Sequence, residues 1–289
     1  MQIRSYAKIN LLLRILGRRR DGYHNLLSLF QRIDLWDELS YEPLAGRIEV
    51  ESDSPELPSG PFNLAFRAAE ILASQAGRNA GVRIRIAKRI PVGAGLGGGS
   101  SNAGTTLIAL NRLWNLGLSA RELANIGKTI GSDVPFFCHE ISAAWVAGRG
   151  ERVTPARVRF DAWYLLVSPG FSISTAEAYR LWDESPEADK KKLTKGIDKY
   201  TISSFQTLTR RALYSRLGND FDEVIFRRYP VFSDLRKEMT ALGAKKVMLS
   251  GSGSTLFGVF LDKREVQRAE TRFQRDHPGS GRVFLVGAI

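Results

Sequence analysis

Apolar positions along the chain follow two periods, and the change from one to the other marks the expected elements. A period of two, or a short apolar run, predicts strands at 9–16, 26–35, 47–50, 82–86, 143–146, 163–167, 246–249, 255–260 and 282–286. A spacing of three and four predicts helices at 64–76, 175–182, 205–217 and 232–242, and others beginning near Ser100, Ser119 and Lys263. Helices and hairpins segregate more than they alternate, so we expect an α+β fold.

A glycine-rich segment, the glycine loop, lies between the strand at 82–86 and the helix near Ser100. It reads Pro91-Val92-Gly93-Ala94-Gly95-Leu96-Gly97-Gly98-Gly99-Ser100-Ser101. Glycine adopts backbone conformations closed to other residues and exposes N–H groups at close range. With the positive end of the following helix, these groups form a site for phosphate. A linker that binds nothing is the alternative, and the regular elements on both sides argue against it.

The order of residues in this loop narrows the kind of phosphate site. A Walker-type loop ends in Gly-Lys-Ser/Thr, whereas Ser100 and Ser101 stand here where the lysine would be. A dinucleotide fingerprint needs an acidic residue about twenty positions on, after a second strand, and that region is helical in pattern. We therefore expect a triphosphate held by backbone N–H groups and serine hydroxyls.

The length and the charge of the chain limit the number of domains and the classes of ligand. A chain of 289 residues forms one large or two modest domains. The net charge of +12 suits either nucleic acid or small phosphorylated ligands. The basic runs at 18–20, 190–192 and 227–228 are scattered, and no nucleic-acid-binding motif accompanies them. We expect no nucleic-acid partner. The polar segment 183–199 predicts an exposed surface connection, with a gate over the site as the alternative.

The pattern of the sequence predicts no membrane span, no signal peptide and no metal-ligand cluster. No apolar run approaches the roughly twenty residues of a membrane span, and no signal peptide is recognisable, so we expect no membrane partner and a cytoplasmic location. The one cysteine and three histidines form no metal-ligand cluster. Cys138 follows Phe136 and Phe137, which favours a buried apolar side chain over a reactive thiol.

Three segments together resemble the GHMP small-molecule kinases. The glycine loop is similar to the family's phosphate-binding motif, and Leu-Ser-Gly-Ser-Gly-Ser-Thr at 249–255 is similar to its C-terminal glycine motif. Ala-Lys-Ile-Asn-Leu at 7–11 with Asp-Gly-Tyr-His at 21–24 resembles one branch, whose small-molecule substrate is diphosphocytidyl methylerythritol. The resemblance implies a two-domain fold with the active site in the interdomain cleft, and we expect domains at 1–156 and 157–289.

The resemblance also implies the reaction, the ATP-dependent phosphorylation of a substrate hydroxyl on the non-mevalonate route to isoprenoid precursors. Asp133 matches the family's catalytic aspartate and would act as general base. Lys8 matches its lysine and would orient the hydroxyl and stabilise the transferring charge. Taken alone, Asp133 fits a turn or helix cap equally well, and Lys8 fits an edge or surface lysine.

The same resemblance assigns the remaining ligand contacts. Tyr23 and Tyr179 match residues that sandwich the cytosine, and His24 would bond to the base edge. Asn10 and Thr175 would hold oxygens of the substrate. Mg²⁺ is expected with ATP, held by phosphates, water and Ser101, because only Asp133 suggests itself as a carboxylate ligand. Singly, these residues fit ordinary packing.

Two other functions stay open. A GHMP kinase acting on homoserine or mevalonate would lack the Asp-Gly-Tyr-His segment and an aromatic pair for a base. An RNA-binding protein would use the net charge, but would need a continuous basic face.

Overall fold

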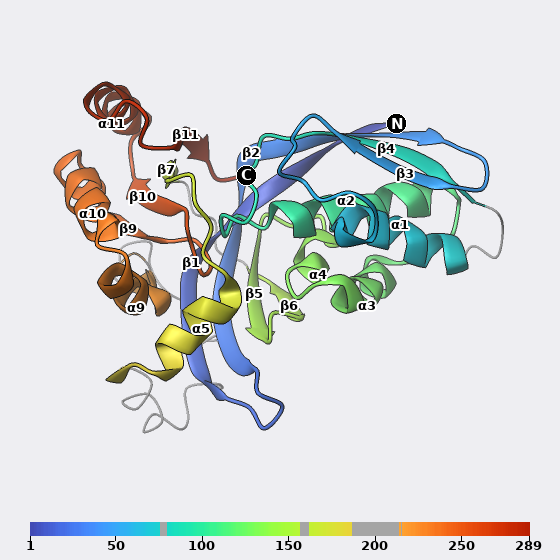
Figure 1. Cartoon of the computed structure of the whole chain (residues 1–289), viewed down its shortest axis with the longest axis horizontal. Coiled ribbons are helices and arrows are strands. Elements are labelled where there is room, and N and C mark those ends of the chain that lie inside the picture. Colours follow the sequence, from blue (N-terminus) through green and yellow to red (C-terminus); the bar gives the residue numbers. More distant parts are fainter. Residues whose placement is uncertain (76–79, 157–161, 187–213, 215) are drawn as a thin grey trace.

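The computed structural model describes residues 1–75, 80–156, 162–186, 214 and 216–289. Within them the chain forms a seven-stranded and a four-stranded sheet, each with helices packed against it (Figure 1). The two-part α+β fold predicted from the sequence is confirmed. The expected boundary after residue 156 adjoins 157–161, which lie outside the described residues, so that boundary stays a prediction.

The larger sheet is built around one long antiparallel hairpin, β1 (Gln2–Arg18) and β2 (His24–Pro43). Both strands are longer than the predicted 9–16 and 26–35, because backbone pairing continues through polar residues such as Arg4 and Glu38. The sheet order is β3-β4-β2-β1-β8, and β5 pairs with the first half of β2 and with β6. These other strands are β3 (Ile48–Ser52), β4 (Val82–Ala87), β5 (Ala143–Gly148), β6 (Arg152–Pro155) and β8 (Gly218–Asn219).

Helices cover one face of this sheet, and a separate hydrophobic core lies between the helices and the sheet. The predicted N-cap at Ser119 is confirmed, since it forms a capping box with Glu122. Cys138 is 2% exposed, and burial raises the pKa of its thiol to about 12, so its predicted role as an apolar side chain is confirmed.

The helices are η1 (Gly60–Phe62), α1 (Leu64–Gln75), α2 (Gly98–Leu113), α3 (Ala120–Ile130) and α4 (Val134–Phe137).

The four-stranded sheet of the C-terminal half is antiparallel, in the order β11-β7-β10-β9. The sequence pattern missed the helix α9 (Phe221–Arg228). The predicted helix at 205–217 lies mostly outside the described residues, and so does the part 187–199 of the predicted surface connection. The elements are β7 (Trp163–Ser168), α5 (Thr175–Asp183), α9 (Phe221–Arg228), α10 (Val231–Ala241), β9 (Lys246–Leu249), β10 (Leu256–Phe260), α11 (Lys263–Asp276) and β11 (Arg282–Gly287).

One hydrophobic core joins the two sheets. Ile9 and Leu11 of β1 belong to the same buried cluster as Tyr164 of β7 and Phe257 of β10. The chain end adds a polar link, because the N–H of Gly287 donates to Asp34 at 2.6 Å. The two halves therefore share buried contacts along β1 and β2, and these fix the position of one half relative to the other.

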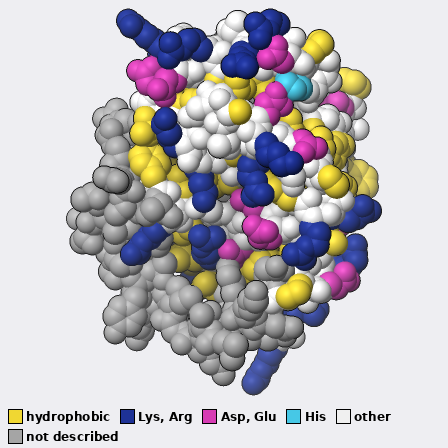
Figure 2. Space-filling model, turned by 90° about the vertical axis from the view of Figure 1, so that its left-hand side faces the viewer, with side chains coloured by type: hydrophobic (Ala, Val, Ile, Leu, Met, Phe, Trp, Pro, Cys, Tyr) yellow, Lys and Arg dark blue, Asp and Glu magenta, His cyan; other side chains and the backbone are white. Residues whose placement is uncertain are grey.

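The surface of the C-terminal half, turned to the viewer in Figure 2, carries its basic residues singly or in small groups among acidic, apolar and neutral side chains. On the described part of this face they form no continuous basic field. Among the described residues, no helix combines the length and the apolar character needed to cross a bilayer.

Candidate active site

A cavity of about 1240 Å³ lies where the glycine loop, the β1–β2 hairpin and the C-terminal half meet. Its volume exceeds that of a typical site for one small ligand, roughly 300–1,000 Å³, so two ligands fit. The residues singled out from the sequence that line it are Lys8, Asn10, Tyr23, His24, the ten residues from Pro91 to Ser100, Asp133, Thr175 and Tyr179.

The glycine loop owes its shape to two close approaches. A Cβ on Gly95, which has φ +79°, would lie 2.0 Å from the carbonyl oxygen of Ser250. A Cβ on Gly97, with φ +70°, would lie 3.1 Å from the Lys8 side chain. Both a left-handed backbone and lack of space therefore require glycine at these positions.

The loop ends at the N-terminus of α2, which begins at Gly98, two residues before the predicted start. The first N–H groups of an α-helix have no intrahelical acceptor, and the cap residue of this 16-residue helix, Gly97, has no side chain to bind them. They point toward the loop, where the helix dipole favours negative charge. The loop and helix together make an anion cradle on the cavity wall.

Ser101 is an exception among the expected phosphate contacts. Its hydroxyl donates to the carbonyl oxygen of Tyr6 and accepts from Ser5, both at 2.7 Å, and the residue is 1% exposed. It does not line the large cavity. We therefore correct the expectation that its hydroxyl contacts phosphate or metal: Ser101 lies behind the loop, whereas Ser100 faces the cavity.

Lys8 and Asp133 meet in the cavity. The Lys8 Nζ lies 3.4 Å from Asp133 Oδ2, with the lysine side chain 3% and the aspartate side chain 29% exposed. The ammonium also lies 4.7 Å from the centre of the Phe30 ring. Burial lowers the pKa of Lys8, and the negative charge of Asp133 opposes part of that effect. The alternative of a surface lysine is wrong.

The carboxylate of Asp133 does not cap a helix, although the residue stands at a helix N-terminus. Asp133 occupies the N-cap position of the short helix α4, yet its carboxylate makes no capping hydrogen bond. The cap alternative therefore accounts for its position but not for its side chain. Asn10 fixes the other partner, since its Oδ1 accepts from Lys8 Nζ at 2.6 Å and its amide donates to Ser28 at 2.9 Å.

The part of the β1–β2 hairpin near its turn lies beside α5 (Figure 1). Aromatic residues of both segments, Tyr23, His24 and Tyr179, line the cavity there. The His24 ring stacks on Tyr179 with centroids 4.5 Å apart, and its Nε2 lies 2.7 Å from Asp183 Oδ1. Burial and the charge of Asp133 raise the pKa of Tyr179 to about 12, so its phenol stays protonated at neutral pH.

Tyr23 is more open, at 57% exposed, with the Arg149 guanidinium 4.6 Å from its ring centre. Sequence reasoning did not find Asp183 or Arg149. Both are distant from the hairpin in sequence, and neither belongs to a recognisable motif.

The second glycine-rich turn, 250–254, docks on the glycine loop. The Ser250 hydroxyl donates to the carbonyl oxygen of Gly95 at 2.9 Å, and the N–H of Thr255 donates to that of Ala94 at 3.1 Å. Thr175 joins the same turn through its hydroxyl, 3.2 Å from that of Ser252. The cavity is thus closed on one side by the C-terminal half.

Two family models match the chain, GHMP kinases N terminal domain over residues 63–140 and GHMP kinases C terminal over residues 202–279. A curated relative from Syntrophus aciditrophicus, named 4-diphosphocytidyl-2-C-methyl-D-erythritol kinase, is 39% identical and covers 100% of this chain and 99% of its own. A relative of the same name from Moorella thermoacetica is 40% identical, with 95% of each chain covered.

Solved structures of related kinases have the same fold as this chain. A crystal structure of 4-(cytidine 5'-diphospho)-2C-methyl-D-erythritol kinase superposes with a TM-score of 0.79 at 33% identity, over 99% of each chain. A homoserine kinase from Cytophaga hutchinsonii, at 16% identity and a TM-score of 0.74 over 99% of this chain and 95% of its own, shares the fold alone. The chain therefore belongs to the GHMP kinases and, among them, to the family of 4-diphosphocytidyl-2-C-methyl-D-erythritol kinases.

Proposed function

We propose that this enzyme transfers the γ-phosphoryl group of ATP to a hydroxyl on the methylerythritol part of 4-diphosphocytidyl-2-C-methyl-D-erythritol. The observation that carries the proposal is the Lys8–Asp133 pair, 3.4 Å apart, beside an anion cradle in one cavity. Phosphoryl transfer needs a positioned hydroxyl, a proton acceptor and compensation of phosphate charge, and the cavity offers a group for each.

Asp133 acts as the general base in this proposal. Its carboxylate accepts the proton of the attacking hydroxyl while the hydroxyl oxygen bonds to the γ-phosphorus and the bond to the β–γ bridging oxygen breaks, releasing ADP. Lys8 lies buried next to it, and its charge stabilises the transferring phosphoryl group. Asn10 keeps the ammonium in place.

The two ligands would occupy opposite ends of the cavity. The triphosphate would bind at the glycine loop, with its charge at the N-terminus of α2. Beyond the loop the lining becomes apolar, with Leu57, Phe62 and Leu64, which suits the nucleotide base. The cytidine would bind at the other end, between Tyr23 and Tyr179, with His24 at its edge.

Mg²⁺ would accompany ATP, and the cavity offers few protein ligands for it. Among the described residues no group of three or more carboxylate, histidine or cysteine side chains could hold a metal by itself. Asp133 and the Ser100 hydroxyl line the same cavity, which suits an ion held largely by phosphates and water. When bound, the ion neutralises phosphate charge.

A turnover assay tests the proposal. ADP release is measured with 4-diphosphocytidyl-2-C-methyl-D-erythritol, homoserine and mevalonate as acceptors at equal concentration. We expect a kcat/KM at least about 10³-fold higher for the cytidine compound, since a stacked base and bound phosphates contribute several kcal/mol of binding. Equal or greater turnover of homoserine or mevalonate would overturn the proposal.

A further inference from the structure

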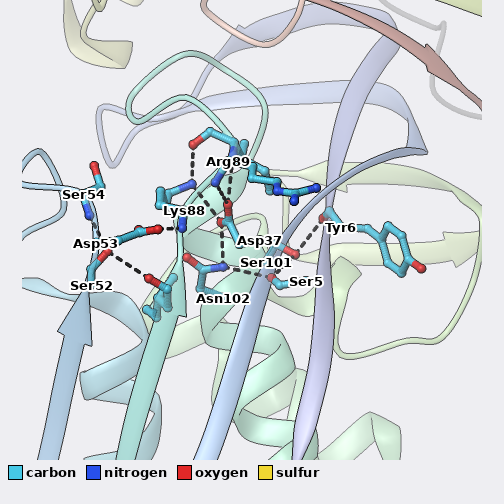
Figure 3. A network of polar contacts seen from close by, with 12 residues as sticks. Ser5, Tyr6, Asp37, Ser52, Asp53, Ser54, Lys88, Arg89, Ser101 and Asn102 are labelled. Carbon is cyan, nitrogen blue, oxygen red and sulfur yellow. Dashed lines mark hydrogen bonds and ion pairs between the residues drawn. The ribbon is translucent and has the colours of Figure 1, made fainter.

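A single buried carboxylate, that of Asp37 on β2, contacts both ends of the glycine loop (Figure 3). Its Oδ1 accepts from the backbone N–H of Arg89 at 2.8 Å and of Ile90 at 2.9 Å, the two residues before the loop. Its Oδ2 accepts from the Asn102 amide at 2.9 Å, on the first turns of α2 just after the loop. Asp37 is fully buried.

The charge of this carboxylate is balanced in place. The Lys88 ammonium lies 2.8 Å from Asp37 Oδ2, with the lysine side chain 2% exposed, and it also donates to the carbonyl oxygen of Ile90. A Cβ on Gly98 would lie 3.2 Å from Lys88 Nζ, so the ammonium sits against the first turn of α2. Without it, a buried negative charge would lie close to the phosphate cradle and repel a triphosphate.

Asn102 completes the connection by a second bond. Its amide donates to the hydroxyl of Ser5 on β1 at 3.0 Å as well as to Asp37. The start of α2 is thus tied to both central strands of the sheet (Figure 3). A glycine-rich loop has little preference for one conformation, so its shape must come from what holds its two ends.

We propose that Asp37 is a positioning residue for ATP, which sets the span and shape of the glycine loop by joining residues 89–90 to Asn102. This rests on the proposed function, in which that loop binds the phosphates of ATP. Asp37 does not touch the nucleotide. It acts through the backbone that does, and Lys88 keeps its charge from opposing the ligand.

The first test replaces Asp37 by its neutral isostere. In Asp37→Asn one oxygen still accepts the N–H groups of residues 89 and 90, but an amide now faces the two donors of Lys88 and Asn102. Loss of a charge-assisted bond predicts a KM for ATP raised about 10-fold, with the KM for the cytidine substrate within about 2-fold of wild type. A purely structural role would instead lower the active fraction, hence kcat, and leave the KM for ATP unchanged.

Asn102→Ala is the second variant, because it removes the bonds of the Asn102 amide to Asp37 and Ser5 and keeps the Asp37–Lys88 pair. We expect its KM for ATP to rise about 5-fold, in line with loss of the hydrogen bonds that tie α2 to the two central strands. Asp53→Asn is the matched control. Asp53 accepts the backbone N–H of Lys88 at 2.8 Å, but it is exposed, and its variant should keep the wild-type KM for ATP.

Binding of a non-hydrolysable ATP analogue, measured by calorimetry, separates this proposal from the choice of substrate. If the wild type binds the analogue but fails to phosphorylate the cytidine compound, the proposed function fails while the effect of Asp37 on ATP binding is still measured. An unchanged analogue affinity in Asn102→Ala, or in a folded Asp37→Asn, overturns the inference. So does an equal loss in Asp53→Asn.

Discussion

The imidazole of His24 lies flat against the ring of Tyr179, with centroids 4.5 Å apart and planes inclined by 9°. His24 is the first residue of β2 and Tyr179 belongs to α5, so this contact joins the two halves of the molecule at the aromatic end of the cavity. Asp183, on the same helix, holds the imidazole at its Nε2. One face of Tyr179 is therefore covered by the protein, and a cytosine would stack on Tyr179 only from the cavity side or after His24 moves.

Removal of the Tyr179 ring should weaken binding of the cytidine substrate. Stacking on an aromatic face contributes about 1–3 kcal/mol per base, so Tyr179→Ala should raise the KM for that substrate about 10-fold. The phenol hydroxyl takes no part in this, and Tyr179→Phe should keep the wild-type KM. Steady-state kinetics at saturating ATP measure both. A wild-type KM in Tyr179→Ala would remove Tyr179 from the substrate site.

Replacement of Asp133 by asparagine should abolish proton acceptance while preserving shape. We expect kcat to fall about 10³-fold, within the range that general-base catalysis supplies, with affinity for an ATP analogue nearly unchanged. Turnover and calorimetry measure the two quantities separately. Near-normal kcat together with lost analogue binding would show that Asp133 binds nucleotide and does not act as the base.

Gly95 and Gly117 have similar left-handed backbones but different surroundings. A Cβ on Gly95 meets the Ser250 carbonyl oxygen at 2.0 Å, whereas a Cβ on Gly117 meets nothing within 4 Å. Gly117→Ala should cost about 1 kcal/mol of unfolding free energy from strain alone. Gly95→Ala should cost at least about 3 kcal/mol, because it separates the two glycine-rich turns. Urea unfolding compares them, and equal costs would contradict this account of the docked turns.

Asp222 should make the unfolding free energy depend on pH. It is buried, and its carboxylate accepts from the N–H of Leu249, the last residue of β9, at 2.9 Å. Burial raises the pKa of this carboxyl to about 7, and the hydrogen bond from the Leu249 N–H and the charges of Arg236 and Lys246 oppose part of the shift. The folded state then binds the proton more tightly than the unfolded state. Stability should be highest below the unfolded pKa of about 4 and should fall as pH rises toward 7.

Asp222→Asn removes this dependence. The variant should gain up to about 4 kcal/mol over the wild type between pH 4 and pH 8, the equivalent of about three pKa units. Asp234→Asn serves as the control, because Asp234 is an exposed carboxylate on α10 paired with Lys237 and is not among the charges that act on Asp222, and it should leave the slope unchanged. Unfolding in urea at several pH values gives the result, and a constant difference between Asp222→Asn and wild type would rule out the buried proton.

Local pattern in the sequence determined much of the fold. The expected strand at 246–249 and the helix at 175–182 agree with β9 and α5 within one residue, because each has a regular apolar period and a clear boundary. The glycine loop was also recognisable, since a glycine-rich segment between a strand and a helix is typical of a phosphate-binding site. The lengths of β1 and β2 were not, because polar residues such as Arg4 interrupt the apolar pattern while backbone pairing continues.

Motifs singled out the residues of the site, but only the tertiary structure decided which of their side chains face it. Ser100 and Ser101 are adjacent and chemically identical, yet the turn of α2 directs one to the cavity and buries the other against β1. The partners of Asp37 and His24, and Asp133 beside Lys8, come from segments far away in sequence. Their contacts exist only because the sheets bring those segments together, and no local periodicity encodes such pairings.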